Sequence, residues 1–160
     1  MISMKPLIVY FSQTGHTRKA ALYIARSVNA DILEIKPDIP YTQQDLDGYN
    51  ESSRTYKEQH DPSSRPGIMD ISLNLDNYKK IIIGFPIWWY IAPRLINTFI
   101  ETVDLTDKEI YLFATSYEST IERAKEELKG EYPKLNYKEA KLLNQLDEEV
   151  IKAWEKEIES

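Results

Sequence analysis

The sequence has no cysteine, few glycines and no apolar run long enough to cross a membrane. Without cysteine there is no disulfide, no thiolate metal site and no thiol nucleophile, which excludes a low-molecular-weight phosphatase. Basic residues are also in the minority, with 20 against 26 acidic ones and a net charge of −6. This balance argues against nucleic acid and anionic membranes and favours partner proteins with basic docking surfaces.

A chain of 160 residues is long enough for one core, and we expect a single domain over residues 1–160. The segment Met1 to Lys5 is too short for a signal peptide, so the cytoplasm is the expected compartment. Residues 37–78 are polar and contain several prolines and tyrosines, which predicts a long irregular excursion with a short helix near 51–59. Such an excursion packs over a sheet face, helps to shield a ligand, or is a surface feature without chemistry.

The stretch V-Y-F-S-Q-T-G-H-T at residues 9–17 is the most informative in the chain. An apolar run ends at a polar turn, and alanine and isoleucine then recur at helical spacing. Hydroxyl groups and one glycine therefore lie at a helix start, where the helix dipole favours an anion such as phosphate. The residues predicted to contact it are Ser12, Gln13, Thr14, Gly15, His16 and Thr17.

The composition of this loop restricts the kind of phosphate ligand. The loop lacks the lysine of a nucleoside-triphosphate loop and has one glycine instead of the three of the dinucleotide fingerprint. A mononucleotide is the ligand that fits best. An ordinary strand-to-helix turn with Ser and Thr as caps is the alternative.

Continuous apolar runs alternate with helical patterns along the rest of the chain. Strands are expected at 7–11, 31–35, 80–85, 109–114 and 137–143, and helices at 16–28, 95–103, 121–130 and 146–158. This alternation predicts an α/β fold with a doubly wound, five-stranded parallel sheet. Trp154 has the spacing of a core residue of the last helix.

Three consecutive aromatic residues follow the third expected strand. Because neighbouring side chains cannot all enter one core, at least one ring should face solvent or a ligand. Ligands of open α/β sheets bind at this end of the strands. The segment Pro86, Ile87, Trp88, Trp89 and Tyr90 therefore suits a flat heteroaromatic ring, although a simply buried Trp is the alternative. A polar loop follows the fourth strand at the same edge, with Thr115, Ser116, Tyr117 and Glu118.

Taken together, the T-G-H-T and G-F-P-I-W-W motifs resemble the flavodoxin family, specifically the branch with T-G-x-T and P-x-W-W loops. The resemblance covers nearly the whole chain and implies a flavodoxin-like sheet of order 2-1-3-4-5 with bound FMN. It implies that residues 12–17 hold the phosphate, that residues 86–90 flank the isoalloxazine, and that residues 115–118 form its other side. Tyr117 is then a stacking candidate.

Two departures from the family pattern stand out. The related branch has a glycine-rich third loop, T-S-G-G-S-G, whereas residues 115–120 here read T-S-Y-E-S-T without glycine. A turn that needs positive φ would be strained there, so flavin affinity or potential should differ. His16 also occupies a position where Asn is commonest, and we expect it to make only a minor contact.

The functional hypothesis is a low-potential, one-electron carrier, with the flavin carrying the redox chemistry and no catalytic residue in the protein. Aromatic rings and nearby negative charge disfavour the reduced, anionic flavin. We expect a monomer or weak dimer. The alternatives are an NAD(P)H-dependent quinone or flavin reductase on the same scaffold, and an FMN-free binding domain. A response-regulator receiver is excluded, because residues 11–13 and 85–86 lack its acidic residues.

Overall fold

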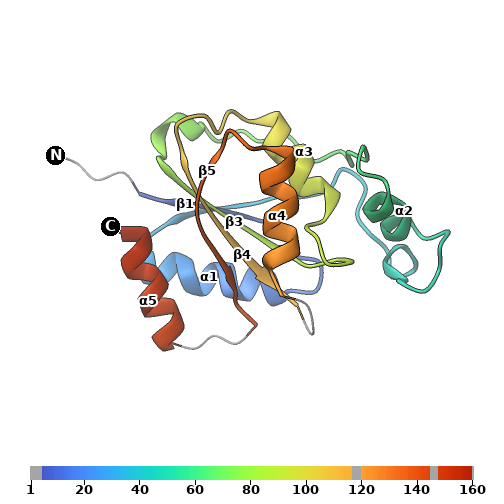
Figure 1. The fold of residues 1–160 in the computed structure, drawn as a ribbon, viewed down its shortest axis with the longest axis horizontal. Helices are drawn as coiled ribbons and strands as arrows, with labels where there is room; N and C mark the ends of the chain where they lie inside the picture. Colours follow the sequence, from blue (N-terminus) through green and yellow to red (C-terminus); the bar gives the residue numbers. More distant parts are fainter. Residues whose placement is uncertain (1–4, 117–119, 145–147, 160) are drawn as a thin grey trace.

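Five parallel strands form one sheet in the computed structural model, which describes residues 5–116, 120–144 and 148–159. Their order is β2-β1-β3-β4-β5, which confirms the order that the family resemblance implies (Figure 1). The strands are β1 (Leu7–Tyr10), β2 (Asp31–Glu34), β3 (Lys80–Pro86), β4 (Glu109–Thr115) and β5 (Asn136–Leu142). The helices are α1 (His16–Val28), α2 (Arg54–His60), α3 (Arg94–Thr102), α4 (Glu122–Glu131) and α5 (Glu148–Glu159).

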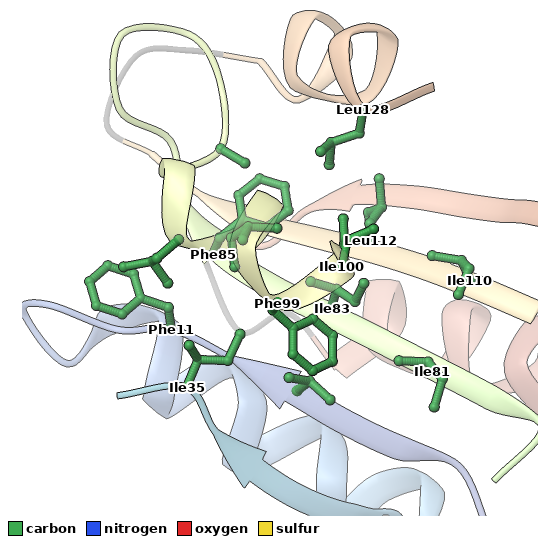
Figure 2. Packing of buried hydrophobic residues seen from close by; sticks show 14 of the residues in the cluster. Phe11, Ile35, Ile81, Ile83, Phe85, Phe99, Ile100, Ile110, Leu112 and Leu128 are labelled. Atoms are coloured by element: carbon green, nitrogen blue, oxygen red, sulfur yellow. The ribbon is translucent and has the colours of Figure 1, made fainter. Parts of the chain in front are cut away.

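Helices cover both faces of the sheet, which explains the continuous apolar runs of the central strands. Ile8 and Ile82 point toward α1 and α5, which lie together along the lower side of Figure 1. Their neighbours Ile81 and Ile83 point toward α3 and α4. Figure 2 shows this second layer, in which Phe99 of α3 packs onto the sheet among the labelled isoleucines.

Gly84 of β3 is required by close packing. A Cβ atom on Gly84 would lie 2.0 Å from Cζ of Phe113 on β4, so only glycine leaves room for that ring. Phe113 in turn contacts Trp154 of α5, with ring centroids 6.2 Å apart. Trp154 is 1 % exposed, which confirms its prediction as a core residue.

The excursion at 37–78 folds into short elements that are tied to the rest of the molecule. It contains the 3₁₀ turns η1 (Gln44–Leu46) and η2 (Leu75–Asn77) and the helix α2. Tyr41 and Tyr78 belong to the same core cluster as the buried residues of α3, and Pro37 pairs with Ile68 in an isolated antiparallel bridge. In Figure 1, α2 projects beyond the sheet at the end where α1 begins.

Element boundaries differ slightly from the sequence prediction. The short helix expected at 51–59 begins at Arg54, because the Ser53 side chain caps it by accepting a hydrogen bond from the Tyr56 amide. The last helix is described from Glu148, and its predicted first residue, Leu146, lies outside the described residues. None of the helices described is both long and apolar enough to cross a membrane.

Candidate functional site

A cleft of about 710 Å³ lies at the carboxyl ends of the strands. Because β1, β3 and β4 are neighbouring parallel strands, the loops that follow them leave the sheet at one edge. The volume is typical of a small-molecule site. The lining residues are Gln13, Thr14, His16, Lys19, Ala20, Leu46, Thr55, Pro86, Ile87, Trp88, Trp89, Thr115, Ser116, Leu143 and Asn144.

This lining includes much of the predicted site but not all of it. Each of the three predicted loops contributes residues. Ser12, Gly15, Thr17 and Tyr90 lie outside the lining. Tyr117 and Glu118, predicted to flank a ring, lie outside the described residues.

The first loop places the start of α1 at the cleft. Gly15 is the N-cap of α1 with φ of 99°, a left-handed conformation that glycine adopts without strain. Its amide donates to Oγ of Ser12 at 3.1 Å, which closes the turn. Gly15 has no side chain to cap the helix, and the helix dipole gives the first turn of α1 a partial positive charge that favours anions.

Thr17 joins the first loop to the third. Its hydroxyl lies 2.8 Å from the hydroxyl of Thr115, and the Thr17 side chain is 2 % exposed. The phosphate contact expected of Thr17 stays a prediction, and in the structure its hydroxyl bonds to the end of β4. The structure thus gives Thr17 a role in linking two walls of the cleft.

The second loop contains a tight turn built from aromatic residues. The amide of Trp88 donates to the carbonyl of Ile91 at 2.9 Å, and that of Ile91 donates back at 3.2 Å. Between them, Trp89 and Tyr90 have φ of 49° and 71°. Two positive φ angles at the central positions are the mark of a type I′ turn, which normally contains Asn or Gly.

The rings of Trp88, Trp89 and Tyr90 lie in different surroundings. Trp88 packs edge-on against Phe11 and Tyr41, with ring centroids 5.5 and 5.3 Å away. Trp89 contacts Tyr56 of α2 at 5.9 Å. Tyr90 is 57 % exposed, which agrees with the expectation that at least one ring leaves the core. Both tryptophans line the cleft.

Tyr41, whose ring packs against Trp88, is itself held by polar contacts. The Tyr41 hydroxyl donates to Glu58 at 2.6 Å, and the Arg54 guanidinium lies 3.9 Å above the Tyr41 ring. Burial, and then the bond to Glu58, raises the pKa of Tyr41 well above its usual range. Tyr41 therefore remains neutral and serves as packing for the aromatic wall.

Sequence reasoning missed six lining residues, and some of them had a detectable pattern. Lys19 and Ala20 lie three and four positions after His16, on the same face of α1. Asn144 follows β5 at the same sheet edge, and its side chain accepts from the Ser116 amide at 2.6 Å. Leu46 and Thr55 come from the excursion, and no local pattern indicates which of its residues reach the cleft.

The cleft lining combines cationic and polar groups with apolar and aromatic ones, which suits an anion next to a flat ring. His16 and Lys19 come from the first turn of α1, and proline, isoleucine and tryptophan come from the 86–89 segment. Within residues 5–116, 120–144 and 148–159, no cluster of three or more His, Asp or Glu side chains is placed to hold a metal ion.

Comparison with known proteins shows a matching family and similar solved structures. A family model described as Flavodoxin matches residues 5–158. The structure superposes with a TM-score of 0.94 on a protein of Bacteroides eggerthii, provisionally named a flavoprotein, which is 45 % identical over 99 % of both chains. A similarly named protein of Bacteroides uniformis is 43 % identical over 97 % of this chain and 99 % of its own, with a TM-score of 0.92.

More distant structures share the fold. A flavoprotein of Lactobacillus acidophilus, solved in complex with FMN, is 22 % identical over 95 % of this chain and 99 % of its own, with a TM-score of 0.76. No curated protein matches the sequence significantly. On the family match and the two Bacteroides relatives, the chain belongs to the flavodoxin family.

Proposed function

We propose that the protein binds FMN in this cleft and acts as a low-potential, one-electron carrier between cytoplasmic partner proteins with basic docking surfaces. The observation that carries the proposal is that the start of α1, with glycine at its N-cap, and two tryptophans line one cleft of about 710 Å³. The FMN-bound relative from Lactobacillus acidophilus supports the choice of cofactor.

The residues present fit the two ends of FMN. The 12–17 loop offers amides, hydroxyls and a left-handed glycine, so its backbone can approach a phosphate closely. Pro86, Ile87, Trp88 and Trp89 offer an apolar, aromatic wall for the isoalloxazine. Residues 115–118 are proposed as the opposite side, and Tyr90 as a residue of the outer rim.

When bound, FMN would supply the redox chemistry, since its ring accepts electrons singly or in pairs. The protein's part is to hold the ring, exclude water from one face and set its electrostatic surroundings. A net charge of −6 and aromatic walls disfavour added negative charge on the ring, which supports a low potential. No residue is needed as a general acid or base.

An FMN titration of the apoprotein, followed by flavin fluorescence, tests the proposal. We expect binding with quenched fluorescence. Trp89→Ala should weaken binding by about 1–3 kcal/mol, by analogy with base–aromatic stacking. Trp154→Phe is the matched control, because Trp154 is buried outside the cleft lining and its indole N–H has no partner among the described residues.

Addition of NADPH to the loaded protein then separates the functional alternatives. No NADPH oxidation, together with reduction by a partner protein, would support a carrier. Steady NADPH oxidation would identify a quinone or flavin reductase instead. If FMN does not bind at micromolar concentration, the proposal is wrong and the domain binds something other than flavin.

A further inference from the structure

The turn at Trp88–Ile91 needs support from outside itself. Trp89 and Tyr90 both adopt left-handed φ angles, of 49° and 71°, although neither is glycine, asparagine or aspartate. Bulky side chains disfavour this conformation, and it persists where surrounding contacts enforce it. The two cross-turn backbone bonds would form equally in a glycine turn and do not explain why aromatic residues are tolerated.

Gln59 of α2 supplies contacts on both sides of this turn. Its side-chain amide donates to the carbonyl of Trp88 at 2.9 Å and to that of Ala92 at 3.2 Å. Its side-chain oxygen accepts from the backbone amide of Arg94 at 3.1 Å. Since a backbone N–H can only donate, the orientation of the Gln59 amide is fixed. Gln59 is 4 % exposed, so water does not compete for these bonds.

Arg94 holds the backbone of Gln59 in position. Its guanidinium donates to the backbone carbonyls of Glu58 and Gln59, at 3.2 and 3.0 Å, at the carboxyl end of α2. It also pairs with Glu127 of α4 at 2.7 Å, and Arg94 is itself 3 % exposed. The end of α2 is therefore fixed to both α3 and α4.

We infer that Gln59 is a positioning residue that holds the glycine-free turn in shape and so sets the aromatic wall of the cleft. The excursion at 37–78 then has a defined role, because it carries the amide that keeps Trp88 and Trp89 in place. The effect on the cofactor rests on the proposed function, whereas the effect on the turn does not.

Gln59→Leu removes the amide while keeping most of the side-chain volume. Amide hydrogen exchange of the apoprotein, without FMN, measures the turn directly. We expect the Trp88 and Ile91 amides, which form the cross-turn bonds, to exchange at least tenfold faster in this variant. In the loaded protein, FMN affinity should fall at least tenfold and the midpoint potential should shift.

Ser53→Ala is the matched control for general loss of α2. Ser53 is the buried N-cap of the same helix, and its side chain accepts a hydrogen bond from the Tyr56 amide, whereas the bonds to Trp88 and Ala92 come from Gln59. This variant should lower the unfolding temperature, keep exchange at Trp88 and Ile91 and FMN affinity within about twofold of wild type, and leave the potential unchanged. Equal effects of the two variants would show that Gln59 merely stabilises the helix and would overturn the inference.

Repeating the Gln59→Leu substitution in a Tyr90→Gly variant tests whether Gln59 acts by holding the strained backbone of the turn. With Tyr90→Gly, position 90 adopts positive φ without strain, so Gln59→Leu should then have a much smaller effect on exchange at Trp88 and Ile91. The same effect in both backgrounds would contradict the inference. If the wild-type protein does not bind FMN, the proposed function fails, but the exchange measurements still decide the role of Gln59.

Discussion

The hydroxyl pair of Thr17 and Thr115 connects residues 98 positions apart in the chain. Both side chains are buried, so replacing one by Val leaves the other hydroxyl without its partner. Each single variant, Thr17→Val or Thr115→Val, should lower the free energy of unfolding by about 1–3 kcal/mol. The double variant should cost less than the sum of the two, because it leaves no buried hydroxyl unpaired.

Urea unfolding of the four proteins in this double-mutant cycle measures the coupling. Thr17→Ser and Thr115→Ser, which keep the hydroxyl, are the controls. Strictly additive losses would mean that the 2.8 Å contact does not join the two loops energetically.

Individual residues also show where sequence reasoning reaches its limit. Gly15 could be predicted at a sharp turn, because glycine before a helical pattern is the usual residue for positive φ. The left-handed angles of Trp89 and Tyr90 could not, because they depend on Gln59, which bonds to Trp88 from 29 positions away. Local propensity carries no information about a bond formed across the fold.

At the scale of elements, the Glu101 carboxylate joins α3 to the end of α4 and to the segment after α2. Nε of Arg65 donates to it at 2.7 Å, and the Tyr132 hydroxyl donates to the same oxygen. The bond from Tyr132, and then the contact with Arg65, hold the pKa of Glu101 below its usual value. A lowered pKa in the folded state means that the ionised carboxylate stabilises the fold.

This stabilisation has a defined pH window. It is fully present above the ordinary Glu pKa of 4.5 and is lost as pH falls through the lower pKa of the folded state. Glu101→Gln should therefore unfold at a lower temperature than wild type at pH 7, and the two proteins should converge as pH falls below that window. Thermal unfolding between pH 7 and 3 measures this, with Glu126→Gln, at an exposed position in the middle of α4, as a control for general charge loss. A difference that stays constant over this range would contradict the role of the ionised group.

The sheet and its covering helices could be predicted because each element carries its own pattern. The continuous apolar run of β3 and the three- and four-residue spacing in α1 both follow from burial on known faces. The excursion could not be predicted in the same way. Its elements are short, and Tyr41 and Gln59 are buried by contacts with distant segments, not by a periodic face.

At the scale of the whole molecule, the strand order of the sheet brings the residues of the candidate site together. Loops after β1, β3 and β4 are far apart in sequence, and parallel strands bring them to one edge. That rule allowed the sequence to predict which loops form the cleft, but not its exact walls. Leu46 and Thr55 reach the cleft from the excursion, whose path no strand order determines.

The net charge of −6 leads to a prediction about partners that rests on the proposed carrier function. Opposite charges speed protein association at low ionic strength, and salt screens the attraction. Electron transfer from the reduced, FMN-loaded protein to a basic acceptor such as cytochrome c should therefore slow by roughly tenfold between low and physiological salt. Ferricyanide, a small anion, is the matched acceptor, and its rate should rise with salt, since repulsion is then screened. Stopped-flow absorbance measures both, and equal salt dependence for the two acceptors would rule out docking through an acidic surface.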